Sequence, residues 1–305
     1  MATVSFISST NTRSYKRQKT LTSILFLVAP LTLLLVFTYL PAINMLLYGF
    51  TKWDGFGPVD NYVGLQNYVD IFTKPEYFQV LEISLYYFVG AIIQLALALY
   101  FATLVSFKLR FKNLFKGILY FPSLINGVAI GFTFLYFFRP DGGLDTFARL
   151  LVGQSADLPL WLGDRSLINI SLAAVSVWRY MGFNFVLFVG AIQSIPADVY
   201  ESSELDGANR WQQFWYIILP GIRPILTLSA ILAVRGALSV FEIPYVMTGG
   251  KNGSSTFVIQ TVNLAFKLNK VGLASAMAIV LLVLIIIITV VQNVLLNDRE
   301  ESQIL

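Results

Sequence analysis

The 305-residue sequence alternates between long apolar stretches and short stretches that carry charge. An α-helix needs about 20 apolar residues to cross the roughly 30 Å hydrocarbon core of a bilayer. Four stretches of that length contain no charge between their ends, and two more are interrupted by a few charged residues. The pattern therefore predicts six transmembrane helices. They lie within residues 23–45, 82–108, 116–139, 168–195, 225–247 and 270–298.

The amino-acid composition is typical of an integral membrane protein. Hydrophobic residues make up 56% of the sequence and charged residues 12%, about half the roughly 25% charged share of soluble domains. An all-α membrane protein is expected, and the net charge of +4 is interpreted as a topology signal rather than as nucleic-acid binding. The chain has no cysteine and no histidine. This excludes disulfides, thiol catalysis, zinc sites, haem ligation by histidine and acid–base catalysis by histidine.

Basic residues indicate which helix ends face the cytoplasm. The loops 46–79 and 139–165 are long and carry four acids each, so they are expected outside. Both termini are then cytoplasmic, with tails at 1–20 and 298–305 around a transmembrane domain at 21–297. The first helix is too long for the apolar part of a signal peptide and is expected to be retained. The basic residues that set this topology are Arg13, Lys16, Arg17, Lys19, Lys108, Arg110, Lys112 and Lys116.

Loop 195–221 departs from the charge rule, because it is placed in the cytoplasm and yet contains four acids. Ser194 is positioned to cap a first helix, with Pro196 in its first turn. Gly207 then permits a backbone turn that a Cβ would resist. A second helix is expected to present one apolar face at the spacing i, i+3, i+4 and i+7. The residues of this face are Trp211, Phe214, Trp215 and Ile218.

Two interpretations of loop 195–221 compete on physical grounds. Its aromatic residues suit an amphipathic helix that lies in the membrane interface. Such helices usually have a basic polar face, whereas this loop is acidic before Gly207. A helix–turn–helix with exposed acids and an apolar stripe is better suited to a groove on another protein.

The same loop resembles the "EAA" loop of ABC importer permeases, in which Glu-Ala-Ala is followed by Asp-Gly and a closing Leu-Pro. Ser202 and Ser203 stand where that family usually has two alanines. The resemblance implies that the loop docks into a cleft of a cytoplasmic ATPase. The residues that carry it are Tyr200, Glu201, Ser202, Ser203, Asp206, Gly207, Ala208, Trp211, Phe214, Leu219 and Pro220.

Three further segments are similar to the first permease subunit of maltose-type sugar importers. They are 62–68, 241–250 and 272–276, with Lys251 where that group usually has proline. The resemblance implies the type I ABC importer permease fold in a bacterial or archaeal plasma membrane, and a carbohydrate as substrate. It also implies a second permease, two ATPase subunits that bind ATP and Mg, and an extracytoplasmic solute-binding protein. Membrane lipid is the remaining partner. This chain itself is then expected to have no catalytic residue, no metal site and no bound cofactor.

Three charged residues lie inside predicted spans, where each costs about 2.5–3.5 kcal/mol at the bilayer centre and should face the protein interior. On one continuous helix, Arg235 and Glu242 share a face about 10 Å apart, so each needs another partner. They are predicted to line a substrate path with polar and aromatic neighbours; structural contacts to carbonyls or to a partner subunit are the alternative. The path residues are Ser176, Arg179, Tyr180, Phe183, Asn184, Arg235, Ser239 and Glu242. Gln94 and Asn126 are expected to form interhelical hydrogen bonds.

The main alternative function is a self-sufficient secondary transporter of a small polar solute. Six spans are few for such a protein, and no paired interrupted helices are evident in the sequence. An integral membrane enzyme is disfavoured, because histidine and cysteine are absent and no acids cluster within a span. A scaffold subunit without a pore is the third alternative.

Overall fold

The computed structural model describes residues 9–107, 111–154 and 156–301. Within these ranges the chain is helical, and the only β-type pairing is an isolated bridge between Thr51 and Tyr62. Residues 1–8 and 302–305 of the predicted tails, and the predicted topology residues Lys108 and Arg110, lie outside the described residues. In chain order the elements are α1 (Ser9–Leu34), the π-helical η1 (Leu35–Tyr39), α2 (Leu40–Tyr48), α3 (Gln66–Thr73), α4 (Pro75–Phe78), the 3-10 helix η2 (Gln79–Leu81), α5 (Ile83–Ser106), α6 (Lys112–Leu124), α7 (Gly127–Phe138), α8 (Gly143–Val152), α9 (Ile168–Gln193), α10 (Ala197–Leu205), α11 (Arg210–Gln213), the π-helical η3 (Phe214–Ile218), α12 (Leu219–Gly221), α13 (Arg223–Leu238), α14 (Glu242–Thr248), α15 (Phe257–Phe266) and α16 (Val271–Glu301).

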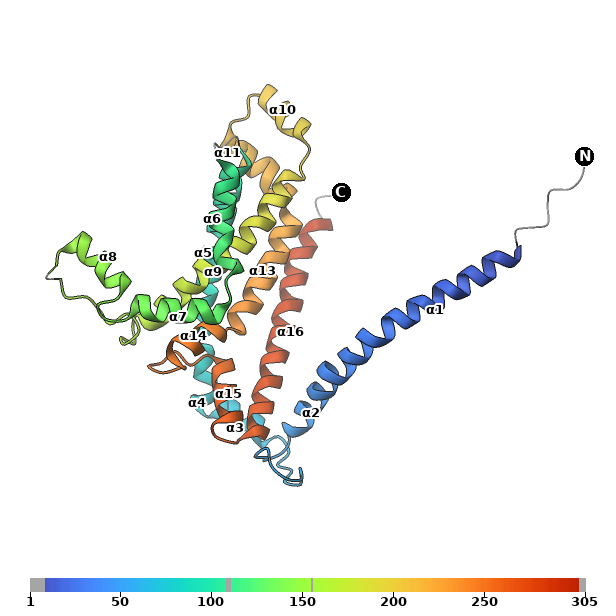
Figure 1. Ribbon diagram of the computed structural model, residues 1–305, viewed down its shortest axis with the longest axis vertical. Coiled ribbons are helices and arrows are strands. Elements are labelled where there is room, and N and C mark those ends of the chain that lie inside the picture. The colour runs from blue at the N-terminus through green and yellow to red at the C-terminus, as the bar shows by residue number, and fades with distance from the viewer. Residues whose placement is uncertain (1–8, 108–110, 155, 302–305) are drawn as a thin grey trace, which may run out of the picture.

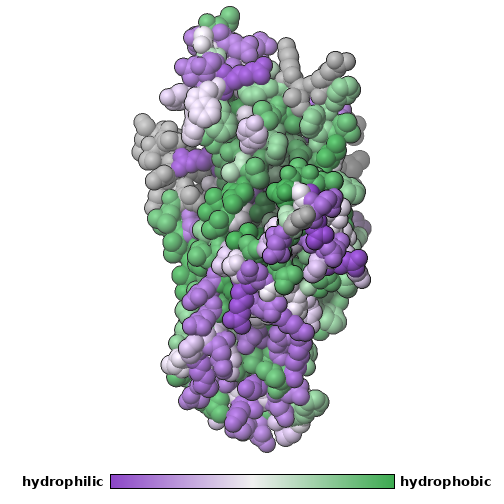
Figure 2. All heavy atoms as spheres, turned by 90° about the vertical axis from the view of Figure 1, so that its left-hand side faces the viewer, coloured by the Kyte–Doolittle hydropathy of each residue, from purple (hydrophilic) through white to green (hydrophobic). Residues whose placement is uncertain are grey.

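Five helical segments among the described residues are long and apolar enough to cross a membrane, and the bent pair α6–α7 makes six if it counts as one crossing. Each coincides with a stretch predicted from hydropathy, and the all-α membrane class is therefore confirmed. Figure 2 shows hydrophobic side chains gathered across the middle of one face, with hydrophilic side chains toward both ends. The five segments are Arg17–Tyr48, Pro75–Ser106, Ile168–Gln193, Arg223–Thr248 and Val271–Leu295.

The third predicted span is not a straight helix, because α6 and α7 meet at 96°. Ile125 is extended (φ −78°, ψ 136°) at the end of α6. Asn126 then caps α7, since its side-chain oxygen accepts a hydrogen bond from the backbone N–H of Val128 at 2.8 Å. The prediction that Asn126 makes an interhelical hydrogen bond is therefore wrong: its side chain starts a new helix instead.

The fifth predicted span is also interrupted. α13 ends at Leu238, and α14 begins at Glu242 after a three-residue break. The hydroxyl of Thr256 donates to the backbone oxygen of Val240 at 2.8 Å and so satisfies one carbonyl that the break exposes. The absence of interrupted helices, expected from the sequence, is wrong at both places. Both segments are apolar enough on average to be predicted as single spans, because hydropathy registers composition rather than the continuity of the helix.

The centre of the bundle is the pair α5 and α9, which pack together along their lengths (Figure 1). Small residues on α5 permit this close approach. Ala98 and Ala102 are fully buried in one cluster with Phe185 and Phe188 of α9. Farther along, a Cβ at Gly90 would lie 3.3 Å from the side chain of Val177. This packing holds fixed the two helices that carry most of the polar side chains discussed below.

The first long helix leaves the bundle. In Figure 1, α1 projects away from the other helices, and only its continuation α2 packs against α16. None of the apolar window within Arg17–Tyr48 is buried by the described chain. The apolar side chains of this helix therefore have to meet lipid or another subunit.

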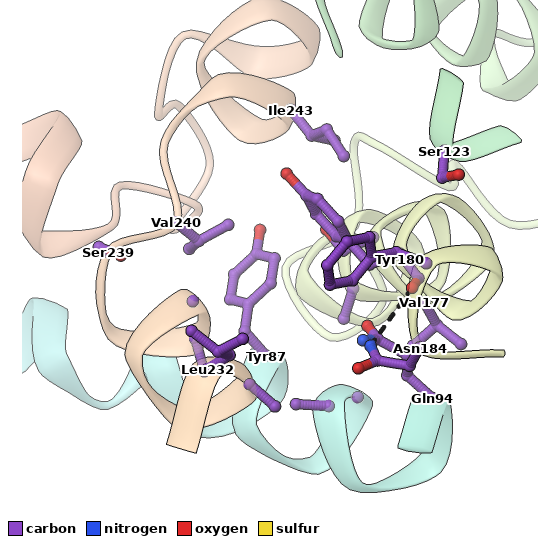
Figure 3. Close-up of a pocket in the computed structure, with 18 of the residues that line it drawn as sticks. Tyr87, Gln94, Ser123, Val177, Tyr180, Asn184, Leu232, Ser239, Val240 and Ile243 are labelled. Carbon is purple, nitrogen blue, oxygen red and sulfur yellow. Dashed lines mark hydrogen bonds between the residues drawn. The ribbon is translucent and has the colours of Figure 1, made fainter. Parts of the chain in front are cut away.

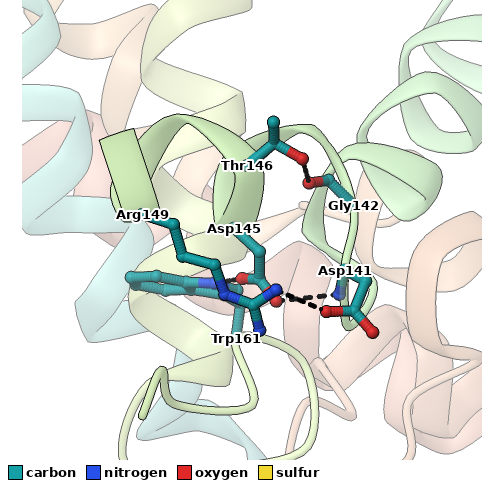
Figure 4. Close-up of polar contacts among 6 residues, drawn as sticks. All are labelled: Asp141, Gly142, Asp145, Thr146, Arg149 and Trp161. Atoms are coloured by element: carbon teal, nitrogen blue, oxygen red, sulfur yellow. Dashed lines mark hydrogen bonds and ion pairs between the residues drawn. The ribbon is translucent and has the colours of Figure 1, made fainter. Parts of the chain in front are cut away.

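The segment after α7 forms a small structured element of its own (Figure 4). Asp145 of α8 is 5% exposed and accepts hydrogen bonds from the indole N–H of Trp161 at 2.7 Å and from the backbone N–H of Asp141 at 2.9 Å. Arg149 and Asp141 form an ion pair at 2.8 Å. These contacts fix α8 to the link that leads into α9.

Candidate coupling loop and translocation cavity

Loop 195–221 folds as two short helices that turn at Gly207, as predicted. α10 ends with the backbone N–H of Ala208 donating to the carbonyl of Ser203 at 2.9 Å. Gly207 has a φ of +80°, a left-handed conformation that L side chains rarely adopt. The predicted capping role of Ser194 is wrong. Its hydroxyl donates back to the carbonyl of Ala191 at 2.7 Å at the end of α9, and Pro196 takes the N-cap position of α10 without a side-chain cap.

Side-chain hydrogen bonds stabilise the start of α11 and join it to α10. Asn209 and Gln212 form a reciprocal capping box at the start of α11, with distances of 2.8 and 2.9 Å. Gln213, which is 2% exposed, donates from its side-chain amide to the hydroxyl of Ser203 at 3.0 Å. Ser203 in turn donates to the carbonyl of Tyr200 at 2.8 Å. The second serine that replaces a family alanine therefore makes the polar contact between α10 and α11.

The base of the loop is packed onto the C-terminal ends of α5 and α9. Ile218 and Ile222 are buried in the cluster that contains Ala102, Phe188 and Ile192. The loop is thereby joined to the two central helices by close-packed apolar contacts.

The predicted apolar face of the second helix is confirmed for three of its four residues. The rings of Trp211, Phe214 and Trp215 lie on one side, with centroids 5.7 Å apart for Trp211–Trp215 and 5.4 Å apart for Phe214–Trp215, and Trp211 is 69% and Trp215 50% exposed. The prediction is wrong for Ile218, which is buried, because the chain is π-helical over Phe214–Ile218 and the i+7 spacing of an α-helix no longer holds. The exposed indole of Trp211 stacks on Phe214, with ring centroids 6.1 Å apart.

The remaining residues predicted for ATPase coupling lie at different depths. Tyr200 is half-buried, burial raises the pKa of its hydroxyl, and that oxygen has no hydrogen-bond partner among the described residues. The guanidinium of Arg210 lies 4.9 Å from the ring centre of Phe107, which joins α11 to the end of α5. Exposed members are Glu201, Ser202, Asp206 and Pro220, and half-buried members are Ala208, Phe214 and Leu219.

A cavity of about 620 Å³ lies between α5, α6, α9 and α13, and the break before α14 forms part of its wall. Its lining combines hydroxyl and amide groups with aromatic rings. In Figure 3, Gln94 of α5 and Asn184 of α9 lie next to one another on one side of the cavity. The residues predicted for the substrate path that line it are Ser176, Tyr180, Phe183, Asn184, Ser239 and Glu242.

Arg179 and Glu242, two of the three intramembrane charges, form an ion pair with a distance of 2.7 Å between Nη1 and Oε2. The pair joins α9 to the first residue of α14. The guanidinium also lies 5.0 Å from the ring centre of Tyr180. A Cβ added at Gly127, the first residue of α7, would collide with both Arg179 and Glu242. Two helix breaks thus meet at one ion pair, which is possible because residue 127 is glycine.

Arg235 does not join the other path residues. The continuous helix assumed for Arg235 and Glu242 is wrong, since α13 ends between them. The cavity face of α13 includes Leu232, Ala233, Gly236 and Ala237. At 3.6 residues per turn, Arg235 points roughly 130° from the middle of that face. It is an exposed residue on the described chain.

Several residues of the site were missed by sequence reasoning. Tyr87 is 4% exposed, lines the cavity, and its hydroxyl has no hydrogen-bond partner among the described residues. Tyr120 and Ser123 line the cavity from α6. Nothing in the local sequence distinguishes these hydroxyls from others in the same apolar stretches. Gln213 was also missed, because its partner Ser203 lies ten residues earlier on another helix and the local sequence does not show that the two meet.

Apolar helices around a cavity whose lining includes amide and hydroxyl groups, together with an ordered helix–turn–helix packed onto the same helices, form the arrangement expected of a multi-pass solute permease. The chain belongs to the family described as "binding-protein-dependent transport system inner membrane component", whose model matches residues 94–299. This family consists of transport components, which agrees with the expectation that the chain is not an enzyme.

Individual relatives cover most of the chain. A probable ABC transporter permease, YurN of Bacillus subtilis (strain 168), is 32% identical over 273 residues, which are 88% of this chain and 93% of that protein. MsmF of Streptococcus mutans serotype c (strain ATCC 700610 / UA159), a permease of a multiple sugar-binding transport system, is 28% identical over 88% of this chain and 92% of that protein. A crystal structure of a bacterial ABC transporter involved in the import of the acidic polysaccharide alginate contains a chain of the same fold. Its TM-score is 0.81 at 20% identity, with 95% of this chain and 99% of that chain covered.

Family membership also decides between two transport classes. The interrupted helices remove one argument that the sequence offered against a secondary transporter, since such breaks are common in those proteins. The match over residues 94–299 nevertheless places the chain among components that work with a binding protein.

Proposed function

We propose that this chain is one transmembrane subunit of an ATP-driven importer of a carbohydrate. The observation that carries the proposal is that loop 195–221 and the cavity share the same two helices, α5 and α9. The base of loop 195–221 packs on α5 and α9, and the same two helices line the cavity. An ATPase that moves the loop would therefore move the cavity wall. The MsmF relative, named for a multiple sugar system, supports a carbohydrate as the solute.

The proposal includes a division of labour among subunits. Two cytoplasmic ATPase subunits bind ATP and Mg, and this chain binds no cofactor and no metal. An extracytoplasmic solute-binding protein delivers the substrate, in agreement with the family description. The complex lies in a bacterial or archaeal plasma membrane, with six crossings in this chain and both termini in the cytoplasm.

A second permease completes the pore in this proposal. The support is α1, whose apolar window is unburied by the rest of the described chain, and Arg235, which is exposed on a helix inside the apolar region. An intramembrane arginine exposed to lipid is costly. A related but distinct second permease that covers these surfaces removes that cost.

Affinity purification of this chain from its native cells tests the proposal. The expected result is co-purification of an ATPase, lost on Glu201→Lys, and ATP-dependent sugar uptake by the reconstituted complex only when the binding protein is added. Ser202→Ala serves as a matched control at an exposed neighbouring position. Uptake by this chain alone without ATP would refute the proposal.

A further inference from the structure

The charge of the cavity wall bears on which carbohydrates it accepts. Among the described lining residues, Glu242 carries the only carboxylate, and no lysine or arginine contributes to the lining. The other polar groups are neutral amides and hydroxyls, such as those of Gln94, Asn184 and Ser176. A substrate in the cavity therefore meets hydrogen-bonding groups and aromatic rings, and the single formal charge that it meets is negative.

The cationic side chain nearest to Glu242 is Arg179, and it is already bound in an ion pair with that residue. Arg179 pairs with Glu242 at 2.7 Å, and the two side chains differ in exposure, with 13% for Arg179 and 37% for Glu242. The guanidinium is covered by the ring of Tyr180 at 5.0 Å and lies against Gly127 of α7. The carboxylate end of the pair faces the cavity, while the cationic end is held behind it.

The other intramembrane arginine does not supply a positive charge to the wall. Arg235 projects roughly 130° from the cavity face of α13 and is absent from the lining. An anionic sugar in this cavity would lose its hydration, would find no cationic side chain among the described lining residues of this chain, and would approach a carboxylate. A neutral sugar avoids both costs and can donate its hydroxyl hydrogens to Glu242 and to the amide oxygens.

We propose that the cavity selects uncharged sugars and rejects uronate-containing ones, with Glu242 as the residue that sets this preference. The inference rests on the proposed carbohydrate import function and narrows its substrate class. The fold alone does not decide the matter, because the alginate importer described above shares the fold at an identity that carries no information about substrate.

The first experiment uses the complete importer in liposomes, with both permeases, the ATPases and the binding protein. Its probes are neutral di- and trisaccharides, and digalacturonate, trigalacturonate and an alginate trisaccharide of matched length. We expect ATP-dependent accumulation of a neutral probe and at least tenfold slower accumulation of every acidic one. Accumulation of any acidic probe as fast as the best neutral probe overturns the inference and leaves the import function intact. Failure to recruit an ATPase, by contrast, overturns the import function itself.

The second experiment assigns the preference to Glu242 without the selectivity of the binding protein. Equilibrium binding of the best neutral probe and of trigalacturonate is measured on the detergent-purified permease–ATPase complex. Glu242→Gln leaves the guanidinium of Arg179 uncompensated, and we expect it to raise the acidic-to-neutral affinity ratio at least tenfold. The double variant Arg179→Met/Glu242→Gln removes both charges and is expected to raise that ratio less.

The chain supplies a matched control for this second experiment. Asp141→Asn breaks the Arg149–Asp141 ion pair, which has nearly the same length, 2.8 Å, but lies outside the cavity lining. Its affinity ratio is expected to stay at the wild-type value. An unchanged ratio in a correctly assembled Glu242→Gln complex would overturn the assignment to Glu242.

Discussion

Gln213 and Ser203 lie ten residues apart in sequence, and the side-chain amide of Gln213 donates to the hydroxyl of Ser203 at 3.0 Å. Gln213 is almost completely buried, so its amide depends on this protein contact rather than on water. A buried donor that loses its partner costs about 1–3 kcal/mol. The relative orientation of α10 and α11 in loop 195–221 is therefore fixed by a polar contact as well as by apolar packing.

Alanine is the usual residue at the position of Ser203 in the loops that resemble 195–221. In this chain, however, replacement of Ser203 by alanine is expected to lower the local stability of the loop. Ser203→Ala strands the Gln213 amide, and we expect about 1–2 kcal/mol of lost local stability. Faster amide hydrogen exchange over α10 and α11 measures the effect. The double variant Ser203→Ala/Gln213→Leu should recover most of the loss, because it removes the unpaired donor.

Ser202 provides the control for that series, since it is exposed and adjacent. Ser202→Ala should leave hydrogen exchange within error of wild type. Equal effects of Ser202→Ala and Ser203→Ala would show that the Gln213 contact does not order the loop.

The turn at Gly207 should tolerate asparagine better than alanine. A Cβ at this position meets no atom within 4 Å, so the penalty comes from the φ of +80° alone. Alanine in the left-handed region costs about 1–2 kcal/mol, and asparagine is better tolerated. We expect ATPase retention during purification in the order wild type, Gly207→Asn, Gly207→Ala. Equal retention by all three would show that the turn is not held in this conformation in the complex.

The hydroxyl of Tyr200 is expected to make the folding stability of the protein depend on pH in the alkaline range. Burial raises its pKa in the folded protein, so the folded state keeps the proton more tightly than the unfolded state. Stability from this group is present below the ordinary tyrosine pKa of about 10 and is lost as pH rises through the raised value. Tyr200→Phe removes the ionisation and also removes a hydroxyl that has no partner among the described residues.

Thermal unfolding of wild type and Tyr200→Phe from pH 8 to 11 measures this difference. The two proteins should be similar at pH 8, and the variant should become the more stable one above about pH 10. A constant difference across the whole range would show that Tyr200 does not titrate differently in the folded state.

The sequence was sufficient for the helical membrane class and for the turn at Gly207, because those depend on local signals. Runs of about 20 apolar residues predict crossings, and a glycine between two helical patterns predicts a turn. The breaks at Ile125 and Val240 were not predictable in the same way. Both lie inside stretches that are apolar enough to cross a membrane, and there the α-helix ends because of side-chain capping at Asn126 and a tertiary hydrogen bond to Val240.

The cavity was only partly predictable for a related reason. Polar residues inside spans were recognised as path candidates, since burial of polar groups in lipid has to be justified by function or pairing. Which of them face each other depends on the packing of several helices. The pairing of Arg179 with Glu242 joins residues 63 positions apart, and it followed from neither spacing nor hydropathy.

A substitution at Gly127 can disturb the Arg179–Glu242 ion pair while both charged side chains stay unchanged. An added Cβ would overlap the guanidinium of Arg179 and the carboxylate of Glu242, so Gly127→Ala should force the ion pair apart. We expect at least a tenfold loss of ATP-dependent uptake with the complex still assembled, because an unpaired charge would be exposed in the cavity wall. Uptake by proteoliposomes and subunit stoichiometry after gel filtration are the two measurements.

The matched control is Gly117→Ala in α6, where an added Cβ meets no atom within 4 Å. Alanine stabilises a helix relative to glycine by up to about 1 kcal/mol, so this variant should assemble and transport like wild type. The contrast between the two substitutions isolates the collision at the ion pair from the general effect of glycine replacement. Wild-type uptake by Gly127→Ala would show that the two helix breaks and the Arg179–Glu242 pair need not stay in contact during transport.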